Sequence, residues 1–86
     1  MDDDPGRPAF VLRAVAVPPG CERAYDEAEW RDALVSVTRG EIELESLGGS
    51  RHSFRTGDVL WLTGLPLRAL CNRGTEPVLL VTVSRR

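Results

Sequence analysis

One histidine and three aromatic residues are the side chains of this sequence best suited to chemistry or ligand contact. His52 is the only histidine, and its ordinary pKa near neutrality suits general acid–base catalysis. Its place on a short strand beside a Gly-Gly-Ser loop equally fits a solvent-facing residue. Tyr25, Trp30 and Trp61 could line the mouth of a pocket, or could pack in a core or a dimer interface. No nucleophile elbow, phosphate-binding loop or Ser/His/Asp order accompanies them.

The two cysteines, Cys21 and Cys71, lie far apart in the sequence and form no CxxC pair. Common zinc sites and redox centres use such pairs. We therefore expect two free thiols, buried as small hydrophobic side chains in a reducing compartment.

Charge, hydropathy and the N-terminal sequence argue against nucleic-acid and membrane partners. The formal net charge is −2 and the sequence pI is about 5.3, whereas a nucleic-acid-binding surface needs a basic stripe. No apolar run approaches the roughly 20 residues that span a bilayer, and the acidic N-terminus is unlike a signal peptide. We therefore expect a cytoplasmic protein with no nucleic-acid partner and no membrane partner.

The length of 86 residues predicts one domain. We assign residues 1–8 to a flexible acidic tail and residues 9–86 to a single β domain. A domain this small buries only a modest fraction of its surface. We therefore expect it to pair with a second copy as a homodimer.

The apolar pattern predicts an all-β fold. Turn signals recur at about the spacing of a β-sandwich or barrel. Strands are expected over residues 10–17, 33–39, 41–45, 59–62, 67–72 and 78–84, with a short strand through His52 and Phe54. The nearly continuous apolar strand 59–62 is expected to be buried on both faces. Residues 22–31 hold helix-forming residues without an apolar stripe, and we expect a loop or an edge strand there. A barrel or jelly roll would remove the exposed edges of such short strands.

Three turn motifs then occur in the order found in small cupins. They are Gly40-Glu41, Gly57-Asp58 and Asn72-Arg73-Gly74-Thr75-Glu76-Pro77. Over residues 20–83, about three quarters of the chain, the sequence resembles the cupin superfamily. The resemblance implies a double-stranded β-helix, or jelly-roll barrel, for residues 9–86. Independently of the family, we expect Gly40 and Gly57 to adopt positive φ in tight turns, and Asp58 to accept hydrogen bonds from turn amides.

The cupin metal motifs lack their histidines here. The first motif, G-x5-H-x-H-x(3,4)-E-x6-G, places Asp26 and Ala28 at the histidine positions and Ala33 at the glutamate position. With the shorter internal gap, Glu27 and Glu29 take the histidine positions instead. Carboxylates could hold a hard cation weakly, but alanine offers no ligand atom.

The second motif, G-x5-P-x-G-x2-H-x3-N, runs from Gly57 to Asn72 and places Arg68 at its histidine. A permanent positive charge there would repel a metal ion. The resemblance therefore implies a cupin without a metal site, and we expect no cofactor.

Arg68 is the sharpest binding candidate that the resemblance provides. If it points into the barrel, as the matching family position does, its charge needs a partner. That partner is either a nearby acid (Asp26, Glu27 or Glu29) in a structural ion pair, or a carboxylate-bearing ligand held by the guanidinium group. Trp30 completes the set of candidate ligand-binding residues.

Three classes of function remain open. The favoured class is a metal-free binding or accessory module that holds a small organic molecule, perhaps anionic, in an Arg68-centred cavity. The second is a metal-independent enzyme resembling sugar epimerases and cyclases, with acid–base chemistry from His52, Tyr25 and one of the three acids. The third is a structural or protein-interaction module whose barrel is filled by its own side chains.

Overall fold

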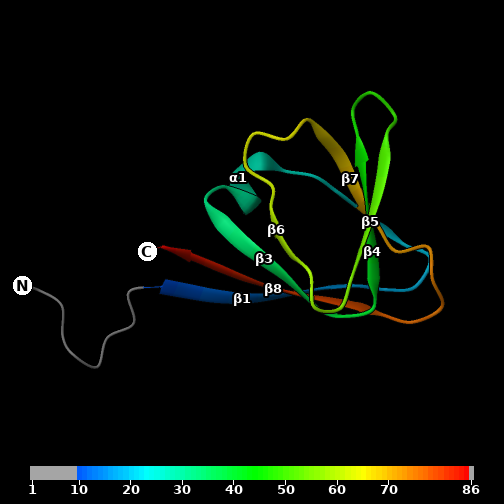
Figure 1. Cartoon of the computed structure of the whole chain (residues 1–86), viewed down its shortest axis with the longest axis horizontal. Helices are drawn as coiled ribbons and strands as arrows, with labels where there is room; N and C mark the ends of the chain where they lie inside the picture. The colour runs from blue at the N-terminus through cyan, green and yellow to red at the C-terminus, as the bar shows by residue number, and fades with distance from the viewer. Residues whose placement is uncertain (1–9, 86) are drawn as a thin grey trace, which may run out of the picture.

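A computed structural model describes residues 10–85, so the predicted tail, residues 1–8, lies outside the described residues. The chain forms two antiparallel sheets that pack against each other (Figure 1). Its elements in chain order are β1 (Phe10–Val17), β2 (Glu22–Ala24), α1 (Glu27–Trp30), β3 (Ala33–Arg39), β4 (Glu41–Ser46), β5 (Arg51–Arg55), β6 (Val59–Trp61), β7 (Leu67–Cys71) and β8 (Val78–Arg85).

The strand order is that of a jelly roll. One sheet has the order β1-β8-β3-β6 and the other has the order β2-β7-β4-β5. Consecutive strands therefore often lie in opposite sheets, as in a double-stranded β-helix. Figure 1 shows β1 and β8 running side by side, with α1 at one end of the barrel near the start of β3. The all-β jelly-roll prediction is confirmed.

The space between the sheets is filled by apolar side chains. Successive residues of a strand point to opposite faces of its sheet, so every second residue of β1, β3, β4 and β8 enters the core. The core cluster consists of Val15, Val17, Trp30, Val35, Val37, Ile42, Leu44, Leu60, Leu62, Leu70, Val78 and Leu80. Burial of these side chains is the main stabilising contribution to so small a fold.

The turns that carry the family motifs have the predicted geometry. Gly40 and Gly57 have φ of 86° and 100°, which L side chains rarely adopt. At Gly40 a Cβ atom would also lie 2.9 Å from the carbonyl oxygen of Pro77. The Asp58 carboxylate accepts a hydrogen bond from the amide of Arg55 at 2.9 Å, which closes the second turn.

Asn72, the last residue of the second motif, organises the loop between β7 and β8. Its Nδ2 donates to the carbonyl oxygens of Val17 at 2.9 Å and Glu76 at 2.7 Å. Its Oδ1 accepts from the amide of Gly74 at 3.0 Å. The side chain is buried, so this motif residue has a structural role.

Residues 22–31 form an edge strand followed by a short helix. The edge strand β2 agrees with the prediction, whereas the helix α1 was not predicted. The helix begins where the Asp26 carboxylate accepts a hydrogen bond from the amide of Ala28 at 3.1 Å. Four residues cannot show an apolar stripe of helical period. Among residues 10–85, no helix is long and apolar enough to cross a membrane.

Two burial predictions are wrong. Strand β6 was expected to be buried on both faces, but Val59 and Trp61 are exposed and only Leu60 and Leu62 are buried. The reason is that no other described residues cover the outer face of this sheet, so Leu34 on the neighbouring strand β3 is exposed as well. Cys71 is buried as expected, but Cys21 is exposed, and both thiols are free.

Candidate functional site

The residues at the cupin metal positions do not converge in this structure. The Asp26 carboxylate caps α1, and Ala33 is a buried side chain without a ligand atom. Glu27 and Glu29, the alternative positions, are each engaged by a hydrogen-bond donor of the chain itself. These residues do not fit the imidazole-rich donor set that a transition metal prefers.

Arg68 does not point into the barrel, so the expected Arg68-centred cavity is wrong, and its partners are Glu22 and Glu45 instead of Asp26, Glu27 or Glu29. Glu45 pairs with Ala69 while Ser46 pairs with Leu67, so Arg68 is an additional residue on β7 at a β-bulge. Strict alternation from the buried Leu70 would direct Arg68 inward. The bulge breaks that alternation, and the Arg68 side chain joins Glu45 on the outer face of the sheet.

On that outer face, Arg68 forms a cluster with two carboxylates, which we call the outer cluster (Arg68, Glu22 and Glu45). The guanidinium donates to Glu45 at 2.6 Å and to both carboxylate oxygens of Glu22 at 3.2 Å. These hydrogen bonds lower the pKa of both glutamates and raise the pKa of Arg68. Arg68 and Glu22 are exposed, so water screens the interaction.

The two glutamates of the outer cluster and the neighbouring Cys71 form the one group of three metal-type ligands among residues 10–85. Ligand atoms of Glu22, Glu45 and Cys71 lie within 4.8 Å of one another. Arg68 already supplies the cation that these carboxylates bind. Burial raises the pKa of Cys71, which favours the thiol over the metal-binding thiolate. The group therefore fits an internal ion pair better than a metal ion.

A second cluster lies between the two sheets at the α1 end of the barrel. We call it the barrel-end cluster, and it consists of Arg13, Arg23, Glu29 and Trp30. Arg13 alternates with the buried Val15, and Arg23 pairs with the buried Leu70, so β1 and β2 direct both arginines to the inner side. Arg13 donates to the Glu29 carboxylate at 2.9 Å, and Arg23 donates to the same oxygen. Glu29 thus joins a strand of each sheet.

The charges of the barrel-end cluster are not balanced. Burial of the Glu29 carboxyl raises its pKa, but the hydrogen bonds from Arg23 and Arg13 outweigh this effect and hold the pKa below its usual value. Two guanidinium groups therefore share one carboxylate. The Arg13 guanidinium also lies 5.5 Å from the centroid of the Trp30 ring, a cation–π contact.

Two donors in this cluster are buried without a hydrogen-bond partner among residues 10–85. They are Nε of Arg23 and Nε1 of Trp30. Buried polar groups of native proteins are nearly always paired, so each such donor calls for an explanation. Leaving a buried donor unpaired costs about 1–3 kcal/mol.

Tyr25 and Glu27 form a third pair beside the barrel-end cluster. The Tyr25 hydroxyl donates to Glu27 at 2.7 Å and lies 3.3 Å from the carbonyl oxygen of Leu62. Burial, with a contribution from Glu27, raises the pKa of Tyr25 to about 12. Tyr25 therefore remains protonated at neutral pH.

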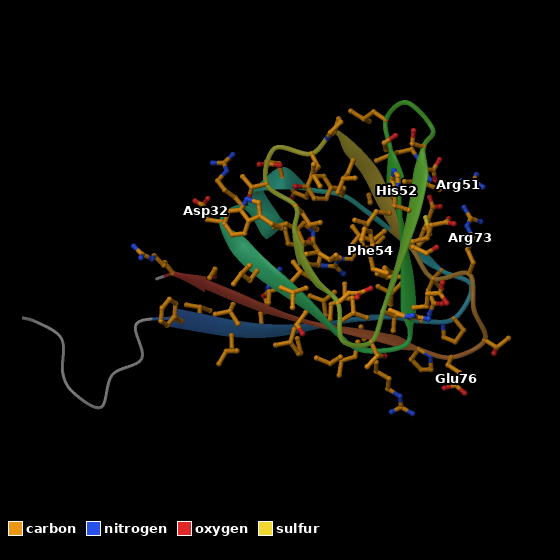
Figure 2. The ribbon with its side chains drawn as sticks, viewed as in Figure 1. Asp32, Arg51, His52, Phe54, Arg73 and Glu76 are labelled. Carbon is orange, nitrogen blue, oxygen red and sulfur yellow. The ribbon has the colours of Figure 1, made fainter. Side chains whose placement is uncertain are left out.

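His52 does not join these residues. It lies on β5 and pairs with Leu44, so its strand position faces the other sheet, but the side chain is exposed on an edge strand. Figure 2 shows His52 and Phe54 on that side of β5, while Arg51 and Arg73 project to the opposite side. Within residues 10–85, no hydrogen bond connects His52 to Tyr25. None connects it to the candidate acids Asp26, Glu27 and Glu29 either.

Sequence reasoning identified half of the barrel-end cluster. Glu29 and Trp30 were predicted as ligand-binding candidates, whereas Arg13 and Arg23 were missed. Arg13 carries a usable signal, because it is a charged residue in phase with the core positions Val15 and Val17 of an apolar strand. Arg23 lies on a strand of three residues, too short for a periodic signal.

Comparison with solved structures agrees with the motifs. The fold matches a Cupin 2 conserved barrel domain protein from Salinispora arenicola with a TM-score of 0.70 and 24% identity, covering 96% of this chain and 68% of that one. It also matches the Cupin_2 domain of an XRE family transcriptional regulator from Enterobacter cloacae, with a TM-score of 0.66 and 17% identity, covering 92% of this chain and 99% of that domain.

A third match is a cupin-superfamily sugar phosphate isomerase from Silicibacter pomeroyi, with a TM-score of 0.63 and 28% identity, covering 94% of this chain and 54% of that one. No protein-family profile and no curated protein matches the sequence. This chain has the fold of the cupin superfamily, as its turn motifs predicted.

Proposed function

We propose that this protein is a metal-free, cytoplasmic binding module that holds a small organic anion at the α1 end of its barrel. In this proposal Arg13 and Arg23 have the role that the sequence motif assigned to Arg68. One observation carries it: two inward-facing guanidinium groups share a single carboxylate, beside two buried donors without partners. A carboxylate or phosphate group would supply the missing negative charge at the exposed parts of the two guanidinium groups.

The proposed site is shallower than the cavity that the sequence predicted. Trp30 and the rest of the core cluster occupy the space between the sheets. The side chains of Arg13 and Arg23 keep 39% and 40% of their surface exposed. An anion would therefore bind at the end of the barrel, against the exposed parts of these two side chains.

The protein contains its own probe for this site, because its two tryptophans differ in position. Trp30 belongs to the barrel-end cluster, and Trp61 lies on the outer face of the sheet β1-β8-β3-β6. In an NMR titration with benzoate and with inorganic phosphate, we expect the Trp30 indole resonance to shift saturably and the Trp61 resonance to remain unchanged. Arg23→Met should weaken the apparent affinity roughly tenfold or more.

Arg68→Met is the matched control for Arg23→Met, since it removes the same type of side chain from the outer face. We expect the control to bind both anions like the wild type. Loss of the Trp30 shift in Arg68→Met but not in Arg23→Met would overturn the proposal. So would the absence of any saturable shift with either anion.

An acid–base enzyme remains the second candidate because of the Tyr25–Glu27 hydrogen bond. A protonated tyrosine beside a carboxylate could act as a general acid, and one structural neighbour is described as a sugar phosphate isomerase. The exposed His52 is not part of this candidate. Isomerisation of aldose and ketose phosphates should then be measurable and should be lost in Tyr25→Phe, whereas no turnover with the wild type would dismiss the enzyme.

A homodimer completes the proposed assembly. Support comes from the small size of the domain and from large apolar side chains that are exposed on one sheet.

A further inference from the structure

Glu29 is the acid of the barrel-end cluster, and both sheets hold its carboxylate in place. Arg13 donates to Oε2 of Glu29 at 2.9 Å, and Arg23 donates to the same atom. Arg13 also donates through its second terminal nitrogen to the backbone carbonyl oxygen of Glu29 at 3.2 Å. The two arginines come from β1 and β2, which belong to different sheets. A movement of this carboxylate would therefore break contacts to both sheets.

The short helix α1 fixes the backbone that carries Glu29. The Glu29 amide donates to the carbonyl oxygen of Asp26 at 2.9 Å, and the next residue, Trp30, is fully buried in the core cluster. The Glu29 side chain itself keeps only 18% of its surface exposed. Because the carboxylate is held on every side, its negative charge stays in the cluster when an anion binds.

The barrel-end cluster therefore has one excess positive charge. Its two arginines carry two positive charges, and Glu29 carries one negative charge. The lowered pKa of Glu29 keeps this residue ionised at neutral pH. The other charged residues at α1 add no net positive charge, because Asp26 and Glu27 are acids and Arg31 is a single base.

A ligand with one negative charge would balance this excess. A carboxylate would pair with the single uncompensated guanidinium charge. A phosphate monoester carries close to two negative charges above neutral pH, because its second pKa is about 6. Its second charge would lose hydration without a partner in the cluster, which is unfavourable. The Glu29 carboxylate also repels a divalent anion about twice as strongly as a monovalent one, since the Coulomb energy is proportional to the ligand charge.

We propose that Glu29 is the specificity-determining residue of this site and selects monovalent carboxylates over divalent phosphates. The inference rests on the anion site of the proposed function and names the class of ligand that this site takes. Arg13 and Arg23 attract any anion, whereas Glu29 limits the ligand to one charge. An uncharged residue at position 29 raises the excess charge to two and shifts the preference toward phosphate.

Benzoate and phenyl phosphate test this inference, since both carry a phenyl ring and they differ in charge. At about pH 8, benzoate carries one negative charge and phenyl phosphate about two. In NMR titrations that follow the Trp30 indole resonance, we expect the wild type to bind benzoate more tightly. In Glu29→Gln, the affinity for benzoate should rise about threefold and the affinity for phenyl phosphate about tenfold. These values correspond to the loss of one negative charge about 6 Å from the ligand in water.

Glu22→Gln is the matched control, because it removes the same charge from the outer cluster. We expect this variant to bind both ligands like the wild type. Arg13→Gln changes the charge in the other direction, since it lowers the excess charge to zero. It should weaken the binding of phenyl phosphate more than that of benzoate. Arg13→Gln also keeps the inference testable if Glu29→Gln does not fold, which circular dichroism and thermal melting establish.

The outcomes separate this inference from the proposed function. A wild type without a saturable shift for either ligand removes the anion site, and the inference with it. If the wild type binds but Glu29→Gln weakens both ligands equally, Glu29 only positions the arginines and the anion site stands without this selection. Tighter binding of phenyl phosphate than of benzoate by the wild type would overturn the inference. So would equal weakening of the two ligands in Arg13→Gln, or a change of preference in Glu22→Gln.

Discussion

Two arginine–glutamate clusters on opposite sides of one sheet use the same residue types with opposite stoichiometry. The barrel-end cluster has two arginines on one glutamate, and it lies between the sheets next to the buried Trp30. The outer cluster has one arginine on two glutamates, and it lies on the solvent side of β7. Their charges therefore differ in sign as well as in environment.

Environment decides what each cluster can do. In the outer cluster, Arg68 and Glu22 are exposed, so water screens their ion pair and it contributes little. In the barrel-end cluster, two donors are buried without a partner among residues 10–85, which is costly. The excess positive charge of the barrel-end cluster therefore supports a ligand-binding role, whereas the excess negative charge of the outer cluster is ordinary surface chemistry.

Replacing Trp30, the aromatic residue of the barrel-end cluster, should have the largest effect on the free energy of unfolding. Trp30 is fully buried, so Trp30→Ala leaves a cavity and should lower the free energy of unfolding by about 3–5 kcal/mol. The matched control is Trp61→Ala, which removes the same side chain from an exposed position and should cost far less in the monomer. Urea denaturation at low protein concentration measures both. Similar losses in the two variants would mean that Trp30 is not a core residue.

Neutralising the Glu29 carboxylate, which Arg13 and Arg23 share, should have the next largest effect on the free energy of unfolding. Glu29→Gln leaves two guanidinium groups facing each other, and removing one member of a buried ion pair costs about 3–5 kcal/mol. Because Arg13 and Arg23 are partly exposed, we expect about 2 kcal/mol here, after discounting for solvent screening. Glu22→Gln in the outer cluster should change the stability far less. A larger loss for Glu22→Gln would reverse the proposed difference between the clusters.

Acid should remove the stabilising contribution of the Glu29 ion pairs. The folded-state pKa of Glu29 lies below its usual value of 4.5, so its charge stabilises the fold above that pH. This contribution is lost as the pH falls from about 4.5 through the lower folded-state pKa. The free energy of unfolding of Glu29→Gln should therefore depend less steeply on pH below 5 than that of the wild type. The slopes come from urea denaturation at a series of acidic pH values, and an unchanged slope would argue against the ion pairs of Glu29.

Replacing Arg68 should have the smallest effect on the free energy of unfolding. Arg68→Met deletes both ion pairs of the outer cluster, but the Arg68 side chain itself is exposed and its charge is screened by water. We expect a stability close to that of the wild type, with a small difference that disappears as NaCl screens the pairs. Thermal melting with and without salt tests this, and a large loss that persists in high salt would mean that Arg68 is not screened by water.

The fold could be predicted from the sequence because its turns and strands depend on the backbone preferences of neighbouring residues. Gly40 and Gly57 adopt the predicted positive φ, and six of the predicted strands appear within one or two residues of their expected bounds. The site residues were harder to predict because the face on which a side chain lies depends on the pairing register of its strand. A single additional residue at the β7 bulge moved Arg68 from the inner to the outer face.

The remaining errors have the same origin. Val59 and Trp61 were predicted to be buried from their apolar character, but whether the outer face of a sheet is covered is not a property of the strand's own residues. Arg13 was overlooked because an arginine in an apolar strand reads as an interruption. It becomes a site residue only once β1 and β2 place it opposite Arg23 and Glu29.

The sequence by itself determined the strands, the turns and the absence of histidines at the positions where cupins hold a metal. These features depend on backbone preferences and residue identity, which act over a few neighbouring positions. Only the tertiary structure decided which arginines face the inside of the barrel and which apolar residues lie on the exposed sheet. Such choices depend on strand pairing and sheet packing between residues far apart in the chain, where one bulge reverses the side to which a side chain points.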